Sequence, residues 1–168
     1  MKIVNLLFSC IFMMMLLTAC SLDNKSTKDV VLEIPNKEIY TTLLVQGVDK
    51  KGVSSEATLK VITDSNKIQA FIEKVNNMKV VKPPGKEIVK KSKELKKKGN
   101  YFFVLSDKET MDNKVYTLNY LKDGNIIFQE PNGKKQKPNG EGQKMIYVSK
   151  EKHAELLLEM KELLNITF

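Results

Sequence analysis

Few side chains in this sequence can carry out chemistry at neutral pH. The chain has one histidine, His153, and two cysteines, Cys10 and Cys20. His153 stands between Lys152 and Ala154, in a segment whose pattern predicts a surface helix. A catalytic histidine would need a nucleophile beside it, and a surface histidine on a helix is the favoured interpretation. The glycine-rich phosphate loops and the metalloprotease and hydrolase motifs are absent from the sequence. We therefore expect no catalytic residues, no metal site and no cofactor.

The acidic residues are scattered. Asp107, Glu109 and Asp112 flank one predicted turn, and a hydrolase that uses distant paired carboxylates is the least favoured alternative. The run Asp64-Ser65-Asn66 lacks the later glycine and glutamate of a calcium loop. A helix N-cap explains it better.

The strongest compositional signal is a lysine-rich segment at 86–98. It holds seven lysines and two glutamates, a local net charge of +5 in a chain of 168 residues and net charge +8. Such a patch attracts polyanions. The candidate anion-binding side chains are Lys90, Lys91, Lys93, Lys96, Lys97 and Lys98. The alternative is a solvated charged segment with no partner.

Nucleic acid is not expected as the polyanion. All 28 basic residues of the chain are lysines. Arginine, which is best suited to bidentate contacts with bases and phosphates, is missing.

The N-terminus predicts a signal peptide. Lys2 precedes an apolar run from Ile3 to Leu17, which is too short to span a bilayer but long enough for export. The run ends in Leu17-Thr18-Ala19-Cys20, which resembles the lipobox of bacterial lipoproteins. The resemblance implies that residues 1–19 are cleaved between Ala19 and Cys20, and that Cys20 is acylated. An ordinary signal peptide with an incidental cysteine is the alternative.

An acylated Cys20 would place the protein on the extracytoplasmic face of the cell membrane, held by its lipid anchor. Two or more acyl chains hold a protein stably where a single chain does not. The layout resembles the small lipoproteins of Gram-positive bacteria, with a lipidated cysteine, a short tether and one α+β domain. The resemblance rests on residues 17–20 and, more weakly, on the strand-to-helix passage 61–75, and it implies no activity.

The mature chain is predicted to form one domain. Residues 20–35 are interpreted as the lipidated cysteine and a flexible tether, and residues 36–168 as a single α+β domain. Apolar spacing predicts a β-hairpin over 38–62, a helix that follows a cap at 63–65 and is ended by Asn76-Asn77, and a short strand at 78–82. The segment 86–98 favours helix by residue type but offers only a thin apolar stripe.

The second half of the chain predicts mainly strands. A three-stranded meander covers 101–128, a loop covers 131–142, and a strand follows at 145–148. A final helix is predicted over 150–164 with Ser149 as its cap. Because hairpins outnumber crossover units, we expect an antiparallel sheet with the two main helices on one face. The basic insertion is expected to be either a helix that packs lightly on the domain or a partly disordered segment.

These observations favour a non-enzymatic binding or accessory protein of the cell envelope. Its expected partners are the membrane, through the lipid anchor, and an anionic envelope polymer or lipid. The alternative is an inhibitor or immunity-type lipoprotein that uses a sheet face or a loop to bind a protein.

Overall fold

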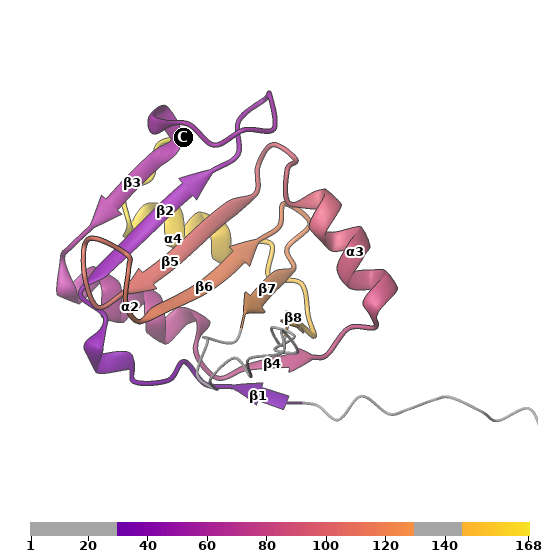
Figure 1. Ribbon diagram of the computed structural model, residues 1–168, viewed down its shortest axis with the longest axis horizontal. Coiled ribbons are helices and arrows are strands. Elements are labelled where there is room, and N and C mark those ends of the chain that lie inside the picture. Colours follow the sequence, from indigo (N-terminus) through magenta and orange to yellow (C-terminus); the bar gives the residue numbers. More distant parts are fainter. Residues whose placement is uncertain (1–29, 130–145) are drawn as a thin grey trace, which may run out of the picture.

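The computed structural model describes residues 30–129 and 146–168, which form an α+β fold around an antiparallel sheet (Figure 1). Within these ranges the sheet has eight strands in the order β1-β4-β8-β7-β6-β5-β2-β3. The strands are β1 (Val30–Leu32), β2 (Thr42–Gly47), β3 (Leu59–Ile62), β4 (Met78–Val81), β5 (Tyr101–Ser106), β6 (Val115–Tyr120), β7 (Ile126–Gln129) and β8 (Ile146–Ser149). The predicted α+β class and antiparallel sheet are confirmed.

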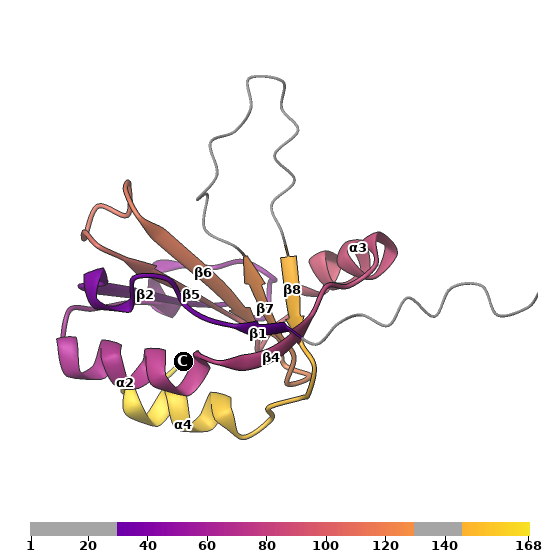
Figure 2. The ribbon, with the colours of Figure 1, turned by 90° about the horizontal axis from the view of Figure 1, so that it is seen from below.

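Two helices connect strands that lie far apart in the sheet. After the hairpin of β2 and β3, helix α2 (Ser65–Val75) leads to β4, near the opposite edge. Helix α3 (Gly85–Glu94) then leads back to β5, in the middle of the sheet. Helix α4 (Leu156–Leu163) lies beside α2, and Figure 2 shows α3 on the other side of the sheet from this pair.

Helix α2 forms where the sequence predicts it. The Asp64 side chain accepts hydrogen bonds from the backbone N–H groups of Asn66 and Lys67, 3.0 and 3.2 Å away, and so caps the helix. This cap satisfies amide groups that have no partner within the first turn. After the helix, Asn77 adopts the left-handed backbone conformation, with φ of 59°, and leads the chain into β4.

The main core lies between the sheet and the two helices α2 and α4. Phe71 of α2 is fully buried and stacks on Phe103 of β5, with ring centroids 5.0 Å apart. Alternate residues of each strand contribute to this core, as the period of two in a strand requires. In β6, for example, Tyr116, Leu118 and Tyr120 are buried in it.

The domain begins earlier than predicted. Residues 30–35 were expected to belong to the tether, but Val30 pairs with Val80 in the sheet. Ile34 is buried in the core, and its N–H donates to Asn76 Oδ1 at 2.9 Å. The prediction was wrong because a three-residue strand is too short to show a periodic pattern.

The last helix is shorter than predicted, and Ser149 does not cap it. Ser149 ends β8, and its buried hydroxyl accepts a hydrogen bond from the N–H of Ile126 at 3.0 Å. The helix begins at Leu156 and ends at Leu163, rather than covering 150–164. The Ser149 hydroxyl therefore bonds to the neighbouring strand and does not cap the helix that the sequence predicts there.

Several predictions fall on residues outside the described ranges. These are the signal peptide 1–19, the cleavage between Ala19 and Cys20, the acylation of Cys20, most of the tether, and the loop at 131–142. Among the residues that the structure describes, no helix is long and apolar enough to cross a membrane.

Candidate binding surface on helix α3

The lysine-rich segment folds as an ordered helix and a following turn. Pro83 and Pro84 end the preceding strand segment, and the carbonyl of Pro84 accepts the N–H of Glu87 at 2.9 Å in the first helical turn. Within α3, Ile88 is half-buried, as is Leu95, which directly follows the helix, and no residue of α3 is fully buried. The helix thus packs through a narrow apolar stripe, as its sequence predicts.

The structure separates the six predicted lysines into three groups. Lys90 and Lys93 lie on the exposed side of α3, and Lys96, Lys97 and Lys98 are exposed on the turn that follows it. Lys91 is different, because its side chain is only 12% exposed. The prediction of one shared patch is therefore wrong for Lys91.

The exposed side of α3 carries a line of lysines that we call the lysine ridge: Lys86, Lys90 and Lys93. Spacings of four and three residues place these side chains on one face of a helix. None of the three forms an ion pair with a residue in the described ranges. Lys86 lies outside the six lysines predicted to bind anions, and belongs to the ridge because of its i,i+4 spacing to Lys90.

Helix α3 is fixed at its C-terminal end by one buried side chain. The amide nitrogen of Asn100 donates to the carbonyl oxygens of Glu94 and Leu95, at 2.5 and 3.1 Å. Its Oδ1 accepts the N–H of Lys122 at 2.8 Å, and the residue is 1% exposed. Asn100 therefore joins the end of α3 to the turn between β6 and β7. No local pattern in the sequence signals this role.

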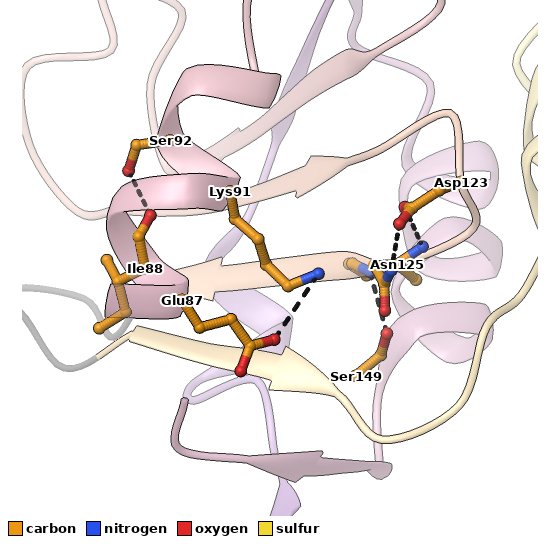
Figure 3. A network of polar contacts seen from close by, with 8 residues as sticks. Glu87, Ile88, Lys91, Ser92, Asp123, Asn125 and Ser149 are labelled. Atoms are coloured by element: carbon orange, nitrogen blue, oxygen red, sulfur yellow. Dashed lines mark hydrogen bonds and ion pairs between the residues drawn. The ribbon is translucent and has the colours of Figure 1, made fainter. Parts of the chain in front are cut away.

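Lys91 points inward from α3, across the sheet (Figure 3). Its Nζ lies 4.0 Å from Glu87 Oε1, one turn earlier. Figure 3 shows the side chain directed toward the turn that holds Asp123 and Asn125.

The pKa of Asp123 is lowered in this setting. Burial alone would raise it, but hydrogen bonds from the backbone and side chain of Asn125, with the charges of Lys91 and Lys152, outweigh burial. The nearest contact is Asn125 Nδ2 to Asp123 Oδ2, at 2.5 Å. The positive charge of Lys91 thus helps to keep the Asp123 carboxyl ionised.

A small cavity of about 30 Å³ lies between α3 and strands β6, β7 and β8. Asn119 of β6 lines it, is 2% exposed, and has an Oδ1 atom without a hydrogen-bond partner in the described part of the chain. A volume of this size suits about one water molecule. Pockets for organic ligands are about tenfold larger or more. This cavity is therefore too small to be a candidate site for an organic ligand. The lysines on the outer side of α3 are the candidate binding surface.

His153 lies in the turn before α4 rather than in the helix. Its N–H donates to the carbonyl of Gly124 at 2.8 Å, and its carbonyl accepts the hydroxyl of Tyr120. Burial raises the pKa of Tyr120 despite the lowering effect of a backbone hydrogen bond. In the described ranges, no group of three or more His, Cys, Asp or Glu side chains is arranged to hold a metal ion.

Comparisons with protein-family models, with curated proteins and with solved structures found no match.

Proposed function

We propose that this protein is a lipid-anchored, extracytoplasmic binding protein whose lysine ridge contacts a phosphate-bearing polymer or lipid headgroup of the cell envelope. The anchor is Cys20, in the sequence Leu17-Thr18-Ala19-Cys20. The role is binding rather than catalysis.

The observation that carries the proposal is the lysine ridge, which forms no ion pair with residues 30–129 or 146–168. Like charges at spacings of three and four residues destabilise a helix, by about 0.2–0.5 kcal/mol for each pair. Lys86 also lies in the first turn of α3, where a positive charge opposes the helix dipole. A bound polyanion would offset both the repulsion between the lysines and the unfavourable interaction of Lys86 with the helix dipole.

The fold supports the same role by holding the ridge in place. Asn100 fixes one end of α3, and the half-buried Ile88 and Leu95 rest on the sheet. The three ammonium groups are therefore presented by a fixed backbone. Near an anionic surface, each lysine contributes about 1 kcal/mol of attraction, which falls as salt is added.

The test uses unlipidated chain, residues 21–168, which contains every residue of the described fold. Binding to soluble poly(glycerol phosphate) and to nanodiscs that contain phosphatidylglycerol would be measured by calorimetry at low salt. We expect Lys86→Gln/Lys90→Gln/Lys93→Gln to weaken binding by about 100-fold, from about 1 kcal/mol per lysine.

The matched control replaces three exposed lysines elsewhere, Lys37, Lys108 and Lys114, with glutamine, and so changes the net charge equally. Equal loss of binding in the two triple variants would show a non-specific charge effect and refute the ridge. Tighter binding to the polymer would identify a phosphate polymer as the ligand, and tighter binding to the nanodisc would identify a lipid headgroup. Separately, Cys20→Ala should abolish lipid processing, and unchanged cleavage and membrane partitioning would refute the anchor.

A further inference from the structure

One face of the sheet is only half covered. Cross-strand register places Leu59, Gln46, Phe102, Asn119, Ile127 and Val148 in one row across this face. Helix α3 lies over the last three residues of the row, as the cavity lining shows. In the described part of the chain, no helix lies over the other half, on β5, β2 and β3 (Figure 1).

The uncovered half, which we call the open face, is largely apolar. A second row of paired residues, Val61, Leu44 and Val104, lies beside the first. Val61 is 51% exposed and Leu59 38% exposed, while Leu44, Phe102 and Val104 are half-buried. Contiguous apolar surface of this kind on a folded domain marks an interaction site.

One end of the open face is basic. Gly52, in the loop between β2 and β3, packs so closely on the turn after α3 that a Cβ there would lie 2.8 Å from the Lys96 carbonyl oxygen. The exposed lysines Lys50, Lys51 and Lys96 therefore gather around this contact. The loop also holds two carboxylates: Asp49, which accepts the N–H groups of Lys51 and Val53 at 2.8 and 3.1 Å, and Glu56, which lies in the short 3-10 helix just before β3.

We propose that the open face binds an acidic amphipathic helix of a partner protein, lying next to α3. The apolar side of that helix would cover Leu44, Phe102 and Val104, and its acidic side chains would meet Lys50, Lys51 and Lys96. Together with α3, the partner helix would cover this face of the sheet. This inference concerns a different surface from the lysine ridge and does not rest on the function proposed for the ridge.

Two other occupants fit the open face less well. A helix on a sheet stands about 10 Å above it, so α3 keeps a flat bilayer away from the half-buried apolar side chains beside it. The segment 130–145 of this chain has four lysines and no aliphatic or aromatic residue before Met145. It would bring like charge and, apart from Met145 and two prolines, no apolar side chain to this site.

The test is site-specific photo-crosslinking of the full chain in its native cells. A photoreactive amino acid replaces Val61 or Val104, in separate variants, and the control position is Leu158 of α4, which is 69% exposed. We expect the open-face positions, but not Leu158, to form one discrete adduct with another protein. Mass spectrometry should map that adduct to a segment rich in Asp and Glu, with apolar residues three and four apart.

A second set of variants tests the charge complementarity. Lys50→Glu/Lys51→Glu/Lys96→Glu should lower the adduct yield about tenfold, a loss of about 1.4 kcal/mol in binding. Lys37→Glu/Lys108→Glu/Lys114→Glu should leave the yield unchanged. Adducts to lipid, to a second copy of the chain or to residues 130–145 would overturn the proposal. So would a crosslinked partner segment that is not acidic and amphipathic, or the absence of a protein adduct at Val61 and at Val104.

Discussion

The side-chain amide of Asn100 donates a hydrogen bond to the main-chain carbonyl oxygen of Glu94, 2.5 Å away. With its bonds to Leu95 and Lys122, this single residue satisfies backbone groups of two segments that lie far apart in the sequence. Helix α3 contributes no fully buried residue of its own. Its position on the sheet therefore depends on Asn100 together with the half-buried Ile88 and Leu95.

Asn100→Ala should destabilise the domain by about 2–3 kcal/mol, because it leaves three partly buried backbone groups without partners. Chemical denaturation followed by circular dichroism measures this loss. Asn113 is exposed and hydrogen-bonds only to Asp107 through its side-chain amide. Asn113→Ala should change stability by less than about 0.5 kcal/mol. Equal effects of the two substitutions would refute the role of Asn100.

Gly52→Ala should destabilise the contact between the β2–β3 loop and α3. Gly52 has φ of +73°, and an added Cβ would lie 2.8 Å from a backbone oxygen. The left-handed backbone alone costs a non-glycine residue about 1–2 kcal/mol. A Cβ added to Gly85, at the start of α3, would meet no atom within 4 Å, so Gly85→Ala should leave the melting temperature unchanged or raise it. A Gly52→Ala protein as stable as wild type contradicts the prediction.

Phe71→Ala should cost about 3–5 kcal/mol, since it removes a fully buried ring that stacks on Phe103. On the same helix, Lys74 pairs with Glu159 of α4 at 2.6 Å, but the two side chains are 35% and 54% exposed. Lys74→Ala should therefore cost less than about 1 kcal/mol. The urea unfolding midpoints of the two variants measure how much stability each side chain contributes, one buried and one in an exposed ion pair on the same helix. A larger effect from Lys74 would contradict this order.

The lowered pKa of Asp123 predicts a pH-dependent contribution to stability. A carboxyl whose folded pKa lies below its ordinary value of 3.8 stabilises the fold above that pH. The contribution is lost as the pH falls through the folded pKa. Asp123→Asn should thus be less stable than wild type at pH 7, and the difference should shrink below about pH 4.

The same carboxyl also tests the inward orientation of Lys91. Lys91→Gln should raise the pKa of Asp123 toward its ordinary value, as measured by NMR titration, because one of its stabilising charges is removed. Lys114→Gln, in the loop before β6, serves as the matched control. An unchanged titration in Lys91→Gln would show that Lys91 does not reach Asp123.

Most of the fold follows from local patterns. The hairpin of β2 and β3, helix α2 with its Asp64 cap, and the β5–β6–β7 meander each have a period or a turn that a single segment displays. These predictions are confirmed. Strand β1 was missed because three residues show no period, and the start of α4 was misplaced because Ser149 bonds across the sheet.

The site was predicted less completely than the fold. Charge density alone identified the segment that carries the lysine ridge. It could not separate the exposed Lys90 from Lys91, since the two are neighbours in sequence and differ only in the side of the helix they occupy. Asn100 and the open face depend on the strand order, which brings distant segments together. No local pattern records that order.

The position of β1 determines how the domain responds to mechanical force. Any pull on the chain before Val30 reaches the fold first through this edge strand, which three residue pairs join to β4. The next attachment is Ile34, buried in the core. Because three residue pairs join β1 to the sheet, we expect it to detach under load before α2, α4 and the other strands unfold. The strand would act as a short extensible element between the domain and whatever holds its N-terminal side.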